Sequence, residues 1–361
     1  MMMIINKIFK WAIYLSFISL QHVVGQSKIP EHILGIYGSP APLWQAGYQL
    51  SDLGVNAIFV RSHSIDSTMS ARAKGEGLLI FAEFPTLNGK NYVNDHPEAW
   101  AINEKGEKVE SASWFMGVCP TDPGFRKYRE TQLHELLQQN SIDGVWLDYV
   151  HWHAQFEEEE PILPETCFCE HCTSAFASAY SKKLPPGPPA QKAKIILSEH
   201  EDDWRKWRCE VILDWVTDLK SIMQNYNPNG LLGIYHCPWR DEEFDGARRK
   251  ILGLDYDMLR SEVDVFSPMV YHQRMHRSEE WVEKNLEWHA QRLKISSNGF
   301  PKLWPIVQAH DVSASSFAQV LRAGLKPPAS GVMMFTSNSI AEDPEKRTIM
   351  QKIFTNRSNQ K

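Results

Sequence analysis

The sequence of 361 residues lacks several features that would each indicate a particular class of protein. Its formal net charge is -6, so it lacks the positive excess that is typical of nucleic-acid binding. No glycine-rich phosphate-binding or dinucleotide-binding motif follows any apolar run, and we expect no organic cofactor. No long apolar run occurs beyond the N-terminus, so we expect no membrane span in the mature chain.

The N-terminus has the three regions of a secretory signal in order. Lys7 and Lys10 precede an apolar run, residues 11–20, and a Val-Val-Gly segment follows it. That run is too short to cross a bilayer. We therefore predict a cleavable signal peptide over residues 1–25 and a mature domain over residues 26–361 that is secreted or periplasmic. No cysteine directly follows the predicted cleavage site, which argues against a lipid anchor.

Short apolar runs alternate with helical patterns along the mature chain, and each run ends in residues that are costly to bury. Eight runs predict strands, at residues 33–37, 55–60, 78–81, 144–148, 231–235, 263–270, 303–307 and 331–335. The most distinct helical patterns cover residues 42–53, 123–139, 191–225 and 345–354. This order fits a single-domain (β/α)8 TIM barrel of the α/β class better than an open doubly wound sheet. The polar strand ends then share the face on which barrel enzymes carry out chemistry.

Four carboxylates follow predicted strands and are the candidate catalytic acids: Glu83, Asp148, Asp241 and Asp311. Hydrolysis of a glycosidic bond needs two carboxyl groups in different protonation states. Asp148 is the first candidate, because it ends the fourth strand beside a phenol and two imidazoles. Glu83 and Asp241 are equal candidates for its partner, since they follow the two neighbouring strands. The alternative roles are structural: an ion pair at the barrel rim for Asp148, and helix caps for the other two.

Other polar and aromatic residues at strand ends form a predicted substrate-binding set: Arg61, His151, His153, His236, Trp239, Tyr271, His272, Gln308 and His310. Flat amphipathic rings beside polar groups suit a sugar-binding cleft, and the chain has 13 tryptophans and 11 tyrosines. Tyr235 and Trp152 are further candidates for stacking on a sugar ring. The histidines of this set, with His63, suit substrate hydrogen bonding, and a catalytic metal centre or a structural role is the alternative. No helical His-x-Glu-x-x-His pair supports the metal alternative.

The cysteines follow a metal-binding pattern. Four of them are the predicted ligands: Cys119, Cys167, Cys169 and Cys172. Three lie within six residues, and four thiolates suit a closed tetrahedral structural zinc site rather than a catalytic one. Disulfides are the alternative, because the chain is predicted to be exported and Cys209 and Cys237 provide further partners.

The segment from Cys167 to Phe176, with an earlier lone cysteine, resembles the zinc-binding cluster of family 42 β-galactosidases. In that family a Cys-x-Cys-x-x-Cys-x-x-x-Phe segment follows the fourth barrel strand. The resemblance implies zinc on the same four cysteines.

A broader part of the chain is similar to glycosyl hydrolase-like barrels that carry an Asp-Gly-x-x-x-Asp-Tyr fourth strand. The matching segments are residues 96–100, 119–123, 143–149 and 264–271. The resemblance implies a catalytic acid at Asp148. Family 42 enzymes, however, have an Asn-Glu pair on the fourth strand and a glutamate nucleophile on the seventh, where this chain has Asp148 and Gln308. The Asp-x-Glu pattern of chitinases also fails, because Val150 replaces the glutamate.

The sequence therefore predicts an exported glycoside hydrolase that acts on a polysaccharide or oligosaccharide. Asp148 acts as nucleophile or general acid/base, with Glu83 or Asp241 as its partner. A carbohydrate-binding pseudoenzyme is the main alternative, because Gln308 replaces a second strand-end acid. A metal-dependent hydrolase or deacetylase that uses the strand-end histidines is a third possibility.

Overall fold

The computed structural model describes residues 29–112, 114–296 and 299–358. The predicted signal peptide, residues 1–25, lies outside the described residues. The described residues from Glu31 onward form one compact unit. Among the described residues, no helix combines the length and the apolar character that a membrane crossing needs.

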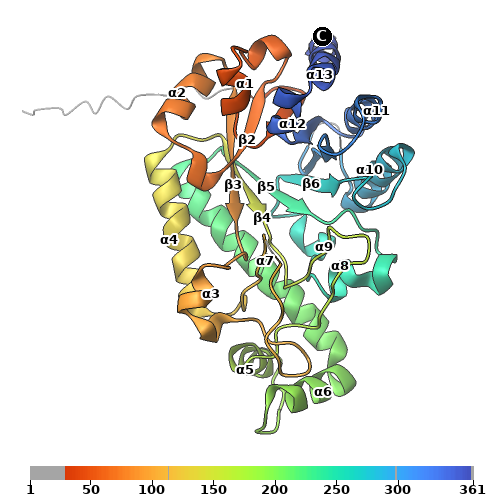
Figure 1. The fold of residues 1–361 in the computed structure, drawn as a ribbon. Helices are drawn as coiled ribbons and strands as arrows, with labels where there is room; N and C mark the ends of the chain where they lie inside the picture. The colour runs from red at the N-terminus through yellow and green to blue at the C-terminus, as the bar shows by residue number, and fades with distance from the viewer. Residues whose placement is uncertain (1–28, 113, 297–298, 359–361) are drawn as a thin grey trace, which may run out of the picture. The chain divides into compact units, whose positions relative to one another are not determined.

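Parallel strands form a closed barrel in this unit (Figure 1). The strands are β1 Ile33–Tyr37, β2 Ala57–Arg61, β3 Leu79–Pro85, β4 Gly144–Asp148, β5 Leu231–His236, β6 Val265–Val270, β7 Lys302–Leu303, β8 Ile306–Gln308 and β9 Gly331–Phe335. Strands β1 to β6 each pair with the next, β8 pairs with β9, and β9 returns to β1. The short strands β7 and β8 both pair with β6 and together fill one position. The barrel thus has eight positions, which confirms the predicted (β/α)8 fold.

Helices connect and surround the strands (Figure 1). They are α1 Ala41–Gln45, α2 Ser67–Gly75, α3 Tyr92–Asp95, α4 Pro123–Gln139, α5 Glu170–Ala179, α6 Pro189–Glu199, α7 Glu201–Tyr226, α8 Ala247–Lys250, α9 Tyr256–Leu259, α10 Glu279–Leu293, α11 Ala314–Gly324, α12 Ser337–Glu342 and α13 Pro344–Ser358. Asp122 caps α4 by accepting a hydrogen bond from the Phe125 amide. Helices α4 and α7 pack side by side against one side of the barrel (Figure 1).

Two predicted helices are interrupted. The pattern over residues 42–53 forms α1 and a separate 3-10 turn, because Gly47 has a φ of +87° and cannot continue a helix. The pattern over residues 191–225 forms α6 and α7, which break at His200 with a φ of -138°. Three acidic residues then begin α7 and interact favourably with its N-terminal dipole.

The barrel interior is filled by aromatic rings. Phe59, Phe81, Trp146 and Trp304 project from different strands or strand ends, and their ring centroids lie 4.6–5.9 Å apart in contacting pairs. Their bulk requires a residue without a side chain on the neighbouring strand. A Cβ on Gly233 would lie 2.1 Å from the Trp146 indole.

The next layer toward the C-terminal ends of the strands is polar. Side chains alternate between the two faces of a strand, so the residue two positions after an interior ring also points inward. This step leads from Phe59 to Arg61, from Phe81 to Glu83 and from Trp146 to Asp148. The aromatic layer therefore forms the floor of the candidate site.

Candidate active site

A cavity of about 180 Å³ lies at the C-terminal mouth of the barrel. We call it the central cavity, and its lining residues are Tyr37, Arg61, Trp114, Asp148, Tyr149, Glu157, Tyr235, Met269, Tyr271, Arg274, Ile306 and Phe335. A larger side cavity of about 410 Å³ is lined by Arg61, His63, Glu83, Pro85, Asn88, Gly89, Lys90, Asn91, Tyr92, Trp114, Tyr128, Arg129 and Tyr149. The two cavities share Arg61, Trp114 and Tyr149, so they adjoin.

Asp148 ends β4 and lines the central cavity. Burial raises the pKa of its carboxyl well above the usual range, and the nearby carboxylates of Glu83 and Glu157 raise that pKa further. A hydrogen bond of 2.9 Å from the Tyr149 amide to Oδ1 acts in the opposite direction. Asp148 therefore retains its proton to a higher pH than an ordinary aspartate.

Glu83 lies on the neighbouring strand β3 and is buried. Its Oε2 accepts a hydrogen bond of 2.7 Å from the Tyr37 hydroxyl and lies 3.7 Å from Nε of Arg61. Burial raises the pKa of Glu83, whereas Tyr37, Arg61 and His63 lower it. The pKa of Glu83 is therefore raised overall, but the hydrogen bond from Tyr37 and the contact with Arg61 favour the ionised form and offset part of the rise.

Glu157 is a third carboxyl of the catalytic region; it lines the central cavity and was not among the predicted site residues. It lies in the loop after β4, and its Oε2 lies 2.9 Å from the Arg274 guanidinium. Burial raises its pKa, while Arg274 lowers it. The second arm of Arg274 binds Glu158 at 3.2 Å, so this arginine fixes the acidic loop to the loop after β6. A run of acidic residues in a loop gives no sequence signal for such a position.

Aromatic side chains complete the cavity walls. Tyr149 has a φ of +53°, an uncommon conformation for a non-glycine residue, and its ring stacks on Phe115 at 5.1 Å. Trp114 is 44% exposed and lines both cavities, with the Arg274 guanidinium 5.4 Å from its ring. An exposed indole between two cavities is suited to stacking against a sugar ring. Trp114 was not predicted as a site residue, whereas Tyr149 is the phenol that the sequence places beside Asp148.

Asp241 does not lie at either cavity. Its carboxylate forms ion pairs with Arg248 and, at 2.8 Å, with Arg292, which together hold its pKa below the usual value. The structure therefore does not bring Asp241 together with Asp148, because the loop after β5 directs it toward α8 and α10. Asp311 lines neither of these two cavities either, and its side chain is 90% exposed.

Of the predicted substrate-binding residues, Arg61 and Tyr271 line the central cavity, and so does the predicted stacking residue Tyr235. His236 does not, because it follows Tyr235 and points to the opposite face of β5. It is fully buried there, and its Nδ1 lies 2.9 Å from the Tyr256 hydroxyl, which also contacts His289 at 3.2 Å. Burial lowers the pKa of His236 well below the usual value.

The remaining predicted histidines are also held by protein groups. Nδ1 of His151 lies 2.7 Å from the carbonyl oxygen of Trp152, and Nδ1 of His153 accepts a hydrogen bond of 3.1 Å from the Gly117 amide. Burial lowers the pKa of each ring to about 4. His272 contacts the Ser316 hydroxyl at 2.9 Å. His310 is half-buried, and its pKa is lowered by burial.

Gln308 and Trp239 lie near the mouth without lining the central cavity. Gln308 is buried, accepts a hydrogen bond of 3.2 Å from the Arg274 amide and donates one of 3.1 Å to the His310 carbonyl. Trp239 is buried against Phe156 and Phe244, and Trp152 is fully buried with its Nε1 bound to the Arg208 carbonyl. Both indoles are therefore core residues rather than exposed platforms.

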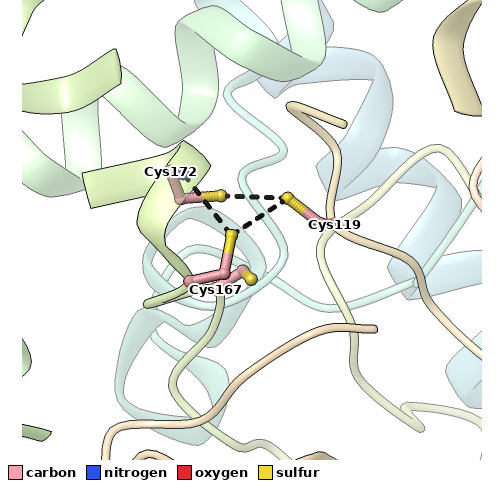
Figure 2. Close-up of side chains that lie close together, drawn as sticks. Cys119, Cys167 and Cys172 are labelled. Atoms are coloured by element: carbon pink, nitrogen blue, oxygen red, sulfur yellow. Dashed lines mark hydrogen bonds between the residues drawn. The ribbon is translucent and has the colours of Figure 1, made fainter. Parts of the chain in front are cut away.

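The four predicted metal ligands converge. The ligand atoms of Cys119, Cys167, Cys169 and Cys172 all lie within 4.8 Å of one another. Sγ of Cys119 lies 3.3 Å from that of Cys169 and 3.4 Å from that of Cys172. Figure 2 shows that Cys119 approaches Cys167 and Cys172 from a separate segment of the chain.

This arrangement fits a metal site better than disulfides. All six cysteines are unbridged, and the other two, Cys209 and Cys237, are buried elsewhere. A tetrahedron of thiolates around zinc has sulfur–sulfur edges of about 3.8 Å, which is close to the observed spacing. Among the described residues, these four cysteines form the group of at least three metal-ligating side chains that lie close together. None of the strand-end histidines belongs to this group.

No protein-family model matches the chain, and no curated protein sequence matches it. Solved structures of glycoside hydrolases share its fold. The glycoside hydrolase domain of PgaB (BpsB) from Bordetella bronchiseptica is 12% identical with a TM-score of 0.63, covering 89% of this chain and 98% of that one. The β-galactosidase of the psychrophilic Marinomonas ef1 is 11% identical with a TM-score of 0.64, covering 90% of this chain and 59% of that one.

Gan42B, a GH42 β-galactosidase from G. stearothermophilus, is 12% identical with a TM-score of 0.61, covering 92% of this chain. This chain spans 58% of the length of Gan42B. Identities this low establish the fold alone. The resemblance stated from the sequence is thus confirmed for the barrel and for the presence of the cysteine cluster: the chain has the (β/α)8 barrel fold of these glycoside hydrolases.

Proposed function

We propose that the protein is an exported glycoside hydrolase that cleaves a polysaccharide or oligosaccharide at the mouth of the barrel, where Asp148 lines the central cavity and Glu83 lines the adjoining side cavity. The observation that carries the proposal is the placement of Asp148 and Glu83 on adjacent strand ends, with different surroundings. Burial raises both pKa values: two neighbouring carboxylates raise that of Asp148 further, to well above the usual range, whereas Tyr37 and Arg61 offset part of the rise for Glu83. Two carboxyl groups whose pKa values differ are what acid and base roles require.

In this mechanism Asp148 is the general acid that donates its proton to the oxygen of the leaving sugar. Glu83 is the carboxylate that acts on the anomeric carbon directly or through a water molecule. Arg61 and Tyr37 hold Glu83 in place, and Arg274 does the same for Glu157. Trp114 and Tyr271 provide ring surfaces for the sugars on either side of the bond.

The test is activity of the mature chain, residues 26–361, on a panel of plant, algal and bacterial glycans, beside Asp148→Asn. Loss of a general acid reduces turnover by about 10²- to 10⁴-fold, because the leaving group then departs without a proton. Released reducing sugar that disappears in the variant supports the proposal. Asp241→Asn is the matched control, because its carboxylate lies in a separate ion-pair cluster, and it keeps turnover if it folds. Full activity of a folded Asp148→Asn variant contradicts the mechanism.

A carbohydrate-binding pseudoenzyme is the second candidate, and Gln308 is the observation that favours it. An amide occupies the end of the seventh barrel position, and both ends of that amide are already hydrogen-bonded to protein. A pseudoenzyme binds a glycan with the same affinity after Asp148→Asn and Glu83→Gln, and releases no sugar in either form. Calorimetric titration with the best-binding glycan separates the two candidates.

The cysteine cluster is proposed to hold a structural zinc ion. Four thiolates fill a tetrahedral shell, so the site has no open position for substrate. Cys119 precedes α4, and the other three ligands lie at the start of α5, so the ion joins two loops on the same side of the barrel. Its role is to stabilise these loops.

A further inference from the structure

The side cavity extends from Glu83, which lines it, toward α4, which contributes Tyr128 and Arg129. Beyond it lies a third cavity of about 310 Å³, which shares His63, Pro85 and Arg129 with it. The three cavities therefore adjoin one another in series from Asp148 to α4. Cavities beyond the point of cleavage are where a glycoside hydrolase binds the remaining sugars of its chain.

Arg129 stands between the side cavity and the third cavity. Its side chain projects from α4, is 7% exposed and lines both. Its terminal nitrogens donate to the Asn88 carbonyl and to Gln132, while Nε is buried without a hydrogen-bond partner. A buried guanidinium is normally paired with a carboxylate.

The described residues provide no such carboxylate for Arg129. It takes part in none of the ion pairs within 4.0 Å, and aromatic rings surround it, with the centroid of Phe125 at 5.1 Å and that of Tyr128 at 5.3 Å. Burial accordingly lowers its pKa to about 10 without a compensating acid. Arg129 is thus a buried cation that lacks a carboxylate partner among the described residues and that lines two cavities which an anionic ligand could enter.

The remaining charges of the side cavity reinforce this positive potential. Arg61 and Lys90 also line it, and its one carboxylate, Glu83, is already bound by Tyr37 and Arg61. Glu135 lines only the third cavity. The whole chain has a net charge of -6, so a positive cavity is a local feature and not a consequence of composition.

We propose that the side cavity is a subsite for an acidic sugar, in which Arg129 pairs with a carboxylate or sulfate group of the glycan. The proposal rests on the proposed function, because it identifies the substrate class of the same site. Tyr128, 37% exposed, and Trp114, 44% exposed, stand at the rim as ring surfaces for that sugar. A planar guanidinium matches the geometry of either anion.

Binding is measured by calorimetry on the Asp148→Asn protein, so that turnover does not interfere. Two matched pairs distinguish the anions: an oligogalacturonate against its methyl ester, and a sulfated galactan oligosaccharide against its desulfated form. The acidic member of one pair is expected to bind more tightly by on the order of tenfold, as for a hydrogen-bonded charge. Adding Arg129→Gln removes this preference, Arg129→Lys retains part of it, and Lys105→Gln, at an exposed site away from the cavities, leaves it unchanged.

Because Arg129 is buried, folding of its variants is checked by thermal unfolding, and Lys90→Gln at the exposed rim provides a second test that does not disturb the core. Lys90→Gln is expected to weaken the same preference. The inference is overturned if neither acidic oligosaccharide binds, if the neutral member binds as tightly, or if folded Arg129→Gln keeps the preference. A different outcome separates the two proposals. If the Asp148→Asn protein binds the acidic glycan more tightly than the neutral one but the wild type does not hydrolyse that glycan, the subsite is supported and hydrolysis of this glycan is refuted.

Discussion

At the scale of single residues, the site depends on how the surroundings of two carboxyls differ. Glu83 accepts a hydrogen bond from Tyr37, and Asp148 has no such side-chain partner among the groups that set its pKa. The consequence is measurable in the pH dependence of kcat/KM. Its acidic limb reports the group that must be ionised, and its alkaline limb reports the group that must be protonated.

Tyr37→Phe is expected to shift the acidic limb of this profile to higher pH. The hydroxyl stabilises the ionised form of Glu83, so its loss raises the pKa of Glu83. One hydrogen bond to a charged group corresponds to about one pKa unit. The alkaline limb, assigned to Asp148, stays in place and serves as the internal control. An acidic limb that stays fixed or moves to lower pH removes Glu83 from the base role.

The sequence predicts part of this site, and strand geometry explains the rest. Alternation along β2, β3 and β4 places Arg61, Glu83 and Asp148 on the inner face together, and each of them was predicted from its position at a strand end. The same alternation along β5 directs His236 to the outer face of the strand, where it is buried. A position at a strand end does not by itself tell whether a side chain points into or out of the barrel. Glu157 could not be predicted, since its position depends on the path of a loop and on its ion pair with Arg274.

At the scale of elements, the aromatic floor determines where the catalytic layer lies. Trp146 lies over Gly233 of the neighbouring strand and donates a hydrogen bond of 3.0 Å to Ser267. The indole occupies the space in which a side chain at position 233 would lie.

Element boundaries were predicted well where apolar runs end in polar residues, and less well where a helix breaks, as at His200, because helical periodicity continues across the break.

Gly233→Ala tests this packing. Its Cβ would lie 2.1 Å from Cε2 of Trp146, so the indole or the strand must shift, and overpacking of this kind costs about 3 kcal/mol. Urea unfolding of the mature chain measures the change. Gly75→Ala, in α2 with no heavy atom within 4 Å of its Cβ, is the matched control and is expected to be neutral or slightly stabilising. Equal stability of the two variants would contradict the role of Trp146 as a rigid floor.

At the scale of the whole molecule, the barrel follows from the repeated order of strands and helices, which is why the sequence alone predicts it. The cysteine cluster is the feature that the barrel itself does not require. It joins the loop before α4 to the segment that begins α5, and β4 with Asp148 lies between these two segments in the chain. Spacing predicts the three clustered ligands, whereas the fourth, Cys119, depends on the barrel bringing two distant loops together.

Metal removal is therefore expected to destabilise the loop before α4 and the segment that begins α5, without unfolding the barrel. Elemental analysis of the purified protein should give one zinc per chain, and Cys119→Ser should reduce this content and lower the melting temperature. Cys209→Ser is the matched control, because that thiol is equally buried but lies 3.7 Å from the Arg249 carbonyl, outside the cluster. Activity lost with a chelator should return with zinc alone, because a closed thiolate shell acts through stability and leaves the catalytic carboxyls intact. A protein that contains no metal, or that keeps its full zinc content in Cys119→Ser, would show that the four thiols are not a metal site.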